Sequence, residues 1–343
     1  MTTMTKGKYE NLMKLCNAKG VIAAAAMDQR GSLQKSIAKA KGVDPKEITP
    51  AQMAEFKTAV TKILTPHATA ILLDPEFGLE AAKQRAKGVG LLLAYESSGY
   101  ENTKPGRMPL LLTDWNVAKL KAAGANAIKI LFYYNPFERT EVNEAKKTWV
   151  EKIGAECVQS DIPFFLEFVG YDVAGGEGKN FEYAKQKPEI VTESMKEFSK
   201  DRYHVDVLKV EVPVNMQYVD GAQSFKNENR VAYNKQEALQ WYKDAAAVTN
   251  KPFIYLSAGV SDEEFRESLE LATESGVQWN GVLCGRATWK DGIPVYAKSG
   301  AKALETWLSD RGVQNIQALN VVINKGATAW WDKYGGKEKI KVA

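Results

Sequence analysis

Eight short apolar runs alternate with longer segments of helical spacing, and this alternation constrains the fold more than any other feature of the chain. Alternating strands and helices predict a parallel sheet that is covered by helices. Eight repeats favour a closed (β/α)8 barrel over an open doubly wound sheet, whose usual Gly-x-Gly-x-x-Gly turn is missing. The predicted strands are residues 21–28, 69–74, 91–96, 127–134, 163–169, 205–212, 253–260 and 281–287.

The helices that we expect between these strands include residues 51–64, 114–123, 141–159, 235–247 and 262–274. Ser261 followed by Glu264 is a capping-box pattern, which predicts where the last of these helices begins. A length of 343 residues is normal for one such barrel with insertions. We therefore expect a single domain over residues 1–343, with a core from about residue 20 to about residue 317, an N-terminal helix and a C-terminal helical extension.

Composition excludes several kinds of partner and cofactor. The 46 basic residues are interspersed with 42 acidic ones, so no basic stripe for nucleic acid is present. No apolar run approaches the roughly 20 residues that cross a bilayer, and no secretory signal is evident, so we expect a cytoplasmic protein without a membrane partner. Three scattered cysteines argue against disulfides, and the two histidines, His67 and His204, are too few for a three-histidine zinc site. We expect no metal and no other cofactor, although a carboxylate site for magnesium stays open.

Charged side chains at the ends of neighbouring strands indicate a site inside the barrel. Lys209 lies in the apolar run 205–212, where a buried cation costs several kcal/mol unless it is paired or loses its proton. Because strand side chains alternate between faces, Lys129, Glu167 and Lys209 are expected to point from three adjacent strands into the interior. Asp28 ends the first strand and completes the group. Glu211 shares the face of Lys209 and either lines the site or pairs with a lysine.

This group matches the needs of an amine nucleophile that attacks a ketone. Lys129 is placed to lower the pKa of Lys209, and Glu167 is placed to shuttle protons. The iminium formed on Lys209 would draw electrons from a carbon–carbon bond, while Asp28 or Glu167 removes a hydroxyl proton. The alternative interpretation is a buried ion network that only stabilises the barrel, and four such residues together favour catalysis.

The last two predicted strands end in a pattern typical of phosphate sites, which barrels often carry at this place. Ser257 supplies a hydroxyl group, Gly259 and Gly285 allow backbone N–H groups to approach an anion, and Arg286 supplies a cation. The alternative is that Ser-Ala-Gly is only a tight turn and that Arg286 pairs with an acidic neighbour. We favour phosphate because both loops carry the feature.

Further polar residues are expected at the same end of the barrel. Gln29 and Arg30 follow the first strand and are candidates for a second anionic group of a substrate, although a surface helix start would explain them equally. Glu96 ends the third strand and has no assigned role. The long connections 170–187 and 213–234 also leave strand ends where barrel active sites lie, and the glycine-rich first one is expected to be mobile.

Six motifs follow one another along the chain: residues 27–31 (MDQRG), 72–78 (LLDPEFG), 92–96 (LLAYE), 207–216 (VLKVEVPVNM), 255–260 (YLSAGV) and 281–289 (GVLCGRATW). In this order and spacing they resemble the family of class I (Schiff-base) tagatose 1,6-bisphosphate aldolases. The resemblance covers almost the whole chain, roughly from Gly20 to Gln317, and implies a (β/α)8 barrel that needs no metal. The implied reaction cleaves tagatose 1,6-bisphosphate into dihydroxyacetone phosphate and glyceraldehyde 3-phosphate.

The resemblance also implies roles for individual residues. The imine lysine falls on Lys209, the acid/base glutamate on Glu167, the auxiliary lysine on Lys129 and the strand-one aspartate on Asp28. The phosphate nearer the imine would contact the Ser257–Arg286 group described above, and the distal one would lie near Gln29 and Arg30.

Members of this family accept several hexulose bisphosphates, so fructose 1,6-bisphosphate is a further expected substrate. The resemblance suggests a homodimer. Two alternatives stay open, a 6-deoxy-6-sulfofructose-1-phosphate aldolase and a non-catalytic regulatory barrel that only binds sugar phosphates.

Overall fold

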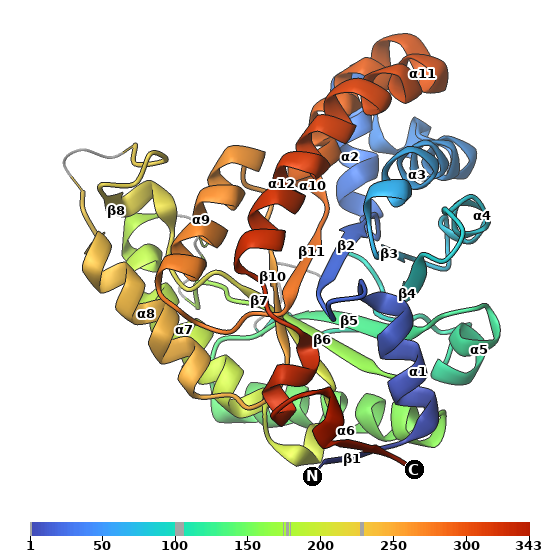
Figure 1. Ribbon diagram of the computed structural model, residues 1–343. Helices are drawn as coiled ribbons and strands as arrows, with labels where there is room; N and C mark the ends of the chain where they lie inside the picture. Colours follow the sequence, from blue (N-terminus) through green and yellow to red (C-terminus); the bar gives the residue numbers. More distant parts are fainter. Residues whose placement is uncertain (1, 100–105, 174, 176–177, 179, 227–229) are drawn as a thin grey trace.

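The computed structural model describes residues 2–99, 106–173, 175, 178, 180–226 and 230–343. Eight parallel strands close into a barrel with the order β2-β3-β4-β5-β6-β7-β10-β11, and β11 pairs with β2. Helices surround this barrel, which confirms the predicted (β/α)8 fold (Figure 1). The strands are β2 (Ile22–Ala26), β3 (Ala70–Leu73), β4 (Gly90–Ala94), β5 (Ala127–Tyr133), β6 (Phe164–Val169), β7 (Val207–Glu211), β10 (Phe253–Leu256) and β11 (Gly281–Cys284).

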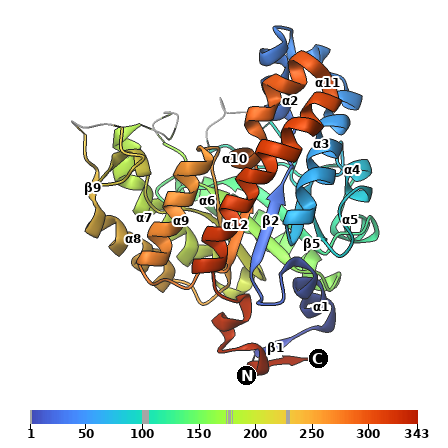
Figure 2. The ribbon, with the colours of Figure 1, turned by 45° about the horizontal axis from the view of Figure 1, so that its top comes forward.

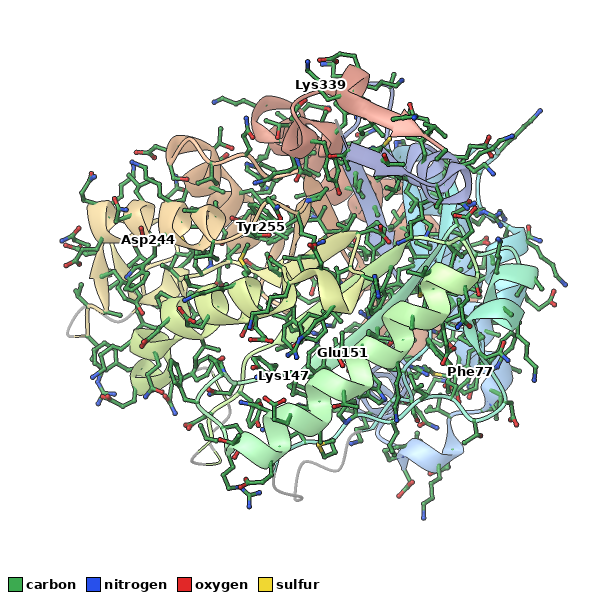
Figure 3. All side chains as sticks on the ribbon, turned by 90° about the horizontal axis from the view of Figure 1, so that it is seen from below. Phe77, Lys147, Glu151, Asp244, Tyr255 and Lys339 are labelled. Atoms are coloured by element: carbon green, nitrogen blue, oxygen red, sulfur yellow. The ribbon has the colours of Figure 1, made fainter. Side chains whose placement is uncertain are left out.

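Helices between the strands follow the predicted segments closely, and two of the predicted ranges match the observed bounds of α8 and α9. Figure 3 shows α6 lying across the outside of the strands, with Lys147 and Glu151 along it. The helices are α1 (Lys6–Leu15), α2 (Gly31–Lys41), α3 (Pro50–Leu64), α4 (Leu79–Lys83), α5 (Val117–Ala122), α6 (Thr140–Gln159), α7 (Phe181–Phe198), α8 (Lys235–Ala247), α9 (Asp262–Glu274), α10 (Arg286–Trp289), α11 (Ile293–Trp307) and α12 (Val313–Gly326).

Helix α7 departs from the sequence prediction, which treated 170–187 as one long connection. The helix already begins at Phe181, where the Asn180 side chain accepts a hydrogen bond from the Tyr183 backbone N–H. Pro188 lies inside α7 and hides it from a pattern search, because proline usually ends a helix. The predicted mobility concerns the glycine-rich part, of which residues 174, 176–177 and 179 lie outside the described residues.

Short elements at the two termini close the N-terminal end of the barrel. Strand β1 (Thr2–Met4) pairs in parallel with β12 (Ile340–Val342), so the chain ends lie side by side (Figure 2). Trp330 is completely buried and contacts the rings of Tyr9, Trp331 and Tyr334 edge-on. This aromatic group belongs to the same apolar cluster as the inward-facing side chains of the barrel strands. It therefore covers the barrel at the end opposite to the carboxyl ends of the strands.

Replacing Trp330 tests whether this cover contributes to stability alone. We expect Trp330→Ala to lower the free energy of unfolding by about 3–5 kcal/mol, because it opens a cavity where a large ring is fully buried. Properties of the carboxyl end of the barrel, measured per folded molecule, should stay unchanged. Chemical denaturation measures the first quantity, with Val321→Ala, at a side chain that is 69% exposed, as the control. A Trp330→Ala protein as stable as the control would contradict this role.

Candidate active site

The strand register brings the predicted residues together inside the barrel. Lys209 of β7 lies directly beside Glu167 of β6 in the parallel ladder. Leu208 and Val210 pack in the outer cluster between strands and helices, whereas Val207 packs in the inner one. Because side chains alternate along a strand, Lys209 shares the inward face with Val207, as predicted. Lys129 enters the interior in the same way from β5.

Five charged side chains form one connected cluster in this interior, and each of them is at most 9% exposed. The Lys129 ammonium donates hydrogen bonds to Asp28 Oδ2 at 2.8 Å and to Glu96 Oε1 at 2.9 Å. Glu167 Oε2 lies 2.8 Å from Lys129 Nζ and also 2.8 Å from Lys209 Nζ. One carboxylate oxygen is therefore shared by two lysines, and Lys209 is the member of the pair that lines the cavity.

Protonation within the cluster follows from burial and neighbouring charges. Burial opposes ionisation of Asp28, but Lys129 and Lys209 outweigh it and hold the pKa of this carboxyl group well below its usual range. Burial also opposes a charged Lys129, yet three carboxylates raise its pKa well above the ordinary value. For Glu96 burial dominates and raises the pKa. Lys129 is thus a firmly held cation and Asp28 a firmly held anion.

The environment of Lys129 is richer in negative charge than the sequence indicated. We expected Lys129 to act mainly as a cation that lowers the pKa of Lys209. In the structure three carboxylates converge on the Lys129 ammonium and compensate its charge, so its effect on Lys209 stays a prediction. Glu96 is the residue that sequence reasoning left without a role. The position of Glu96 at the end of the third predicted strand could have indicated a site residue. Its contact with Lys129 of the next strand could not be predicted from the sequence pattern.

A cavity of about 630 Å³ opens beside this cluster at the carboxyl ends of the strands. Its lining includes Lys209 together with all four predicted phosphate contacts, Ser257, Gly259, Gly285 and Arg286. The two glycines are required sterically. A Cβ at Gly259, whose φ is +82°, would lie 3.0 Å from the Arg286 guanidinium, and one at Gly285 would lie 2.8 Å from the Ala26 carbonyl oxygen.

Gln29 and Arg30, which the sequence placed together as candidates for a distal anion, are separated by the structure. Gln29 lines the cavity, whereas Arg30 does not. The Arg30 guanidinium donates to Glu76 Oε2 and to the Glu96 backbone carbonyl, both at 2.7 Å, and is 5% exposed. Arg30 therefore binds residues outside the cavity lining rather than facing the cavity. The start of α2 at Gly31, which was the alternative interpretation, is also present.

Lys57 is a second residue of this region that sequence reasoning missed. It comes from α3, is completely buried and pairs with Asp74 at 2.5 Å. Its ammonium also donates to the backbone carbonyls of Met27 at 2.6 Å and Gln29 at 2.8 Å. These two carbonyls flank Asp28, so Lys57 fixes the backbone that presents Asp28 to the cluster. A single lysine in a helical pattern normally indicates a solvent-facing side chain, and for this reason Lys57 carried no signal.

Glu211 satisfies both interpretations that the sequence left open. It lines the cavity, and its Oε1 lies 3.5 Å from Lys187 Nζ. Its second oxygen accepts a hydrogen bond from the Gly170 backbone N–H at 2.8 Å. Glu211 therefore ties the connection after β6 to the rim of the cavity.

No set of three or more histidine, cysteine, aspartate or glutamate side chains in the described ranges is arranged to hold a metal ion. The carboxylates of the cluster converge on the Lys129 ammonium instead. Within the same ranges, every helix is too short or too polar to cross a membrane.

Comparison with known proteins yields relatives over the full chain. Residues 22–291 match the model of a family described as DeoC/LacD family aldolase. The tagatose 1,6-diphosphate aldolase of Listeria monocytogenes serotype 4b is 49% identical over 342 residues, which cover 100% of this chain and 99% of that protein. Tagatose 1,6-diphosphate aldolase 2 of Enterococcus faecalis is 50% identical, with coverages of 97% and 98%.

A solved structure with a similar fold is that of fructose-bisphosphate aldolase from Plasmodium falciparum in complex with TRAP and a small-molecule inhibitor. The TM-score is 0.67 at 13% identity, and the match covers 96% of this chain and 98% of that one. At this identity the likeness concerns the barrel fold alone.

The Lys57–Asp74 pair generates a stability prediction. We expect Lys57→Met to cost about 3–5 kcal/mol in the free energy of unfolding, because it leaves Asp74 buried and uncompensated. Adding Asp74→Asn should recover part of this loss, since the amide keeps an acceptor for backbone N–H groups without the charge. Denaturation curves of the single and double variants measure both effects.

Lys62→Met is the matched control on the same helix, because Lys62 forms an exposed ion pair with Glu305. It should change the free energy of unfolding by no more than about 1 kcal/mol. Equal losses in the free energy of unfolding for Lys57→Met and Lys62→Met would show that the buried pair stabilises the fold no more than the exposed pair.

Proposed function

The chain belongs to the DeoC/LacD family of aldolases, and from this premise we propose that it cleaves a ketose 1,6-bisphosphate through a Schiff base on Lys209. The substrate that we propose is tagatose 1,6-bisphosphate, with fructose 1,6-bisphosphate as a second one, and the products are dihydroxyacetone phosphate and glyceraldehyde 3-phosphate. The observation that carries the proposal is the ion pair of 2.8 Å between Lys209 and Glu167 at the wall of the cavity. The names of the two bacterial relatives support the choice of sugar.

The first step forms the covalent bond to the enzyme. Glu167 first takes a proton from the Lys209 ammonium, and the neutral amine then adds to the C2 carbonyl carbon. A proton of the added nitrogen passes to the carbonyl oxygen, which becomes a hydroxyl group. Glu167 then donates a proton to this hydroxyl group, water leaves, and an iminium forms. Glu167 is suited to this transfer because its Oε2 already contacts the Lys209 nitrogen.

The second step breaks the bond between C3 and C4. The bonding electron pair moves toward the iminium nitrogen and gives an enamine, while a carboxylate takes the proton of the C4 hydroxyl group. Asp28 or Glu167 fills this role. Asp28 is held as an anion, and its buried Oδ1 accepts no hydrogen bond from the described residues. Of the two carboxylates, Glu167 is the one that lines the cavity. Protonation at C3 and hydrolysis by water then release dihydroxyacetone phosphate and restore Lys209.

Substrate binding in this proposal uses the loops after β10 and β11. The phosphate on C1 would be held by Ser257, the backbone at Gly259 and Gly285, and the Arg286 guanidinium, which all line the cavity with Lys209. We also propose a cytoplasmic location and a homodimer, as the resemblance to the family implies. Light scattering of the purified protein would measure the latter.

Chemical trapping tests the covalent step. Borohydride added with dihydroxyacetone phosphate should reduce the imine and label Lys209 irreversibly, because only an iminium is converted to a stable secondary amine. Peptide mass spectrometry locates the label, and Lys209→Met should abolish both label and turnover. A label at another lysine, or none at all, would refute the imine on Lys209. A parent protein that binds the sugar phosphate but does not cleave it would support the non-catalytic alternative.

Steady-state assays test the substrate. We expect turnover of tagatose and fructose 1,6-bisphosphates to exceed that of 6-deoxy-6-sulfofructose 1-phosphate, and we expect full activity after treatment with EDTA. The same coupled assay with each sugar measures these rates. A preference for the sulfonated sugar would favour the alternative aldolase, and activity that is lost in EDTA and restored by a metal would contradict the lysine mechanism.

A further inference from the structure

We propose that Arg107, supported by Lys187, binds the distal phosphate of the substrate at the side of the cavity opposite to Arg286. This inference rests on the proposed function and names the group that selects a substrate with anions at both ends. Neither residue was a candidate from the sequence. Both line the same cavity as Lys209 and Arg286.

The position of Arg107 is defined by two aromatic rings. Its guanidinium carbon lies 4.9 Å from the ring centre of Tyr133 and 5.0 Å from that of Tyr171, and both rings line the cavity. Such contacts hold an arginine side chain in one orientation and leave the N–H groups along the guanidinium edge to bind an anion. A planar guanidinium held in this way suits bidentate binding of a phosphate.

The height of this position above Lys209 follows from strand register. Leu131 of β5 is paired with Glu167, and Glu167 is paired with Lys209, so these three side chains face the interior from successive strands. Tyr133 lies two residues further along β5, which places it about 7 Å closer to the mouth of the barrel. Arg107 packs over Tyr133 and therefore lies above the imine nitrogen rather than beside it.

The two cationic ends of the cavity lie across the barrel from each other. Strand β5, which carries Tyr133, is separated from β11, which leads to Arg286, by three strands in each direction around the ring. Lys209 lies on β7, between these two sides. A ketose 1,6-bisphosphate has its carbonyl carbon next to one phosphate and four carbons from the other. With the carbonyl carbon at Lys209, the nearer phosphate would lie at Arg286 and the farther one at Arg107, which matches this asymmetry.

Charge around Arg107 supports an anion rather than a neutral group. Lys146 is completely buried below Tyr171, with its nitrogen 3.3 Å from the Tyr171 hydroxyl oxygen and 4.8 Å from the ring centre. Glu138 accepts a hydrogen bond from the Tyr171 hydroxyl group at 2.9 Å, and Glu211 lies 3.5 Å from Lys187.

The earlier candidates for the distal phosphate are less suitable. Arg30 does not line the cavity, and its guanidinium already contacts Glu76 and Glu96. Gln29 lines the cavity but carries no charge. A doubly charged phosphate is stabilised far more by a cation than by a neutral amide, so Arg107 is the better partner.

The test compares two substrates that differ only in the distal phosphate. We expect Arg107→Ala to reduce kcat/KM for the bisphosphate at least about tenfold, mainly through KM, because a charge-assisted contact is lost. For a ketose 1-phosphate, cleaved to dihydroxyacetone phosphate and glyceraldehyde, the change should stay within about twofold. Lys185→Ala is the control, because Lys185 also lies over an aromatic ring, 5.0 Å from the ring centre of Phe181, but does not line the cavity.

Equal effects of Arg107→Ala on both substrates would overturn the assignment. A selective loss in Gln29→Ala instead would place the distal phosphate at the end of β2. Borohydride labelling of Lys209 with dihydroxyacetone phosphate separates this question from the proposed function, since that compound has no distal phosphate. Labelling in Arg107→Ala with unchanged substrate preference refutes the subsite alone, and absence of labelling in the parent protein refutes the aldolase mechanism.

Discussion

One carboxylate oxygen, Glu167 Oε2, lies 2.8 Å from the nitrogens of both Lys129 and Lys209, and the arrangement of the barrel interior depends on this shared contact. Charges buried this deeply are tolerated only when each has a partner, and removal of one partner leaves the others uncompensated. Strand register supplies the partner here, because it places Glu167 directly beside Lys209. In the proposed mechanism the same pairing gives the Lys209 amine a proton donor, because the two groups lie 2.8 Å apart. On this proposal, stability and chemistry depend on the same atoms.

Support for this contact extends outward through the barrel wall. Lys57 holds the carbonyl groups on both sides of Asp28, and Arg30 holds the backbone carbonyl of Glu96. Each of these cations lies behind a carboxylate that contacts Lys129. Residues on helices and loops thus orient side chains that project from strands, which is how a rigid scaffold keeps a reactive group in place. On its cavity side the cluster presents Lys209 and Glu167, which both line the cavity.

Much of the fold was predictable because its signals are local. Apolar runs identified the eight strands, and the bounds of α8 and α9 followed from helical spacing and from Ser261 as N-cap. The inward direction of Lys129, Glu167 and Lys209 followed from alternation along each strand. What escaped prediction depends on contacts between distant parts of the chain. The pairing of β1 with β12 is an example, because strands of three residues carry no pattern of their own.

Within the site as well, residues with a local sequence signal were predicted, and residues placed by contacts between distant segments were missed. Charged residues at strand ends can be recognised in the sequence because they interrupt an apolar run. Lys57 lies in a helix and Arg107 in a loop, where charged residues are common. Arg30 shows the converse, since a residue next to a site in sequence can point away from it. Helix α7 was obscured by Pro188, whose usual effect is overridden by the packing of the helix on the barrel.

A Schiff base on Lys209 requires that the carbon–oxygen bond of the substrate carbonyl breaks in every turnover, because the Lys209 nitrogen replaces the oxygen. Cleavage in water labelled with ¹⁸O, followed at once by reduction of the product, measures this directly. The Schiff base should place one solvent oxygen on the former carbonyl carbon of dihydroxyacetone phosphate, well above the spontaneous exchange seen without enzyme. Retention of the original oxygen at the spontaneous level would rule out the Schiff base on Lys209.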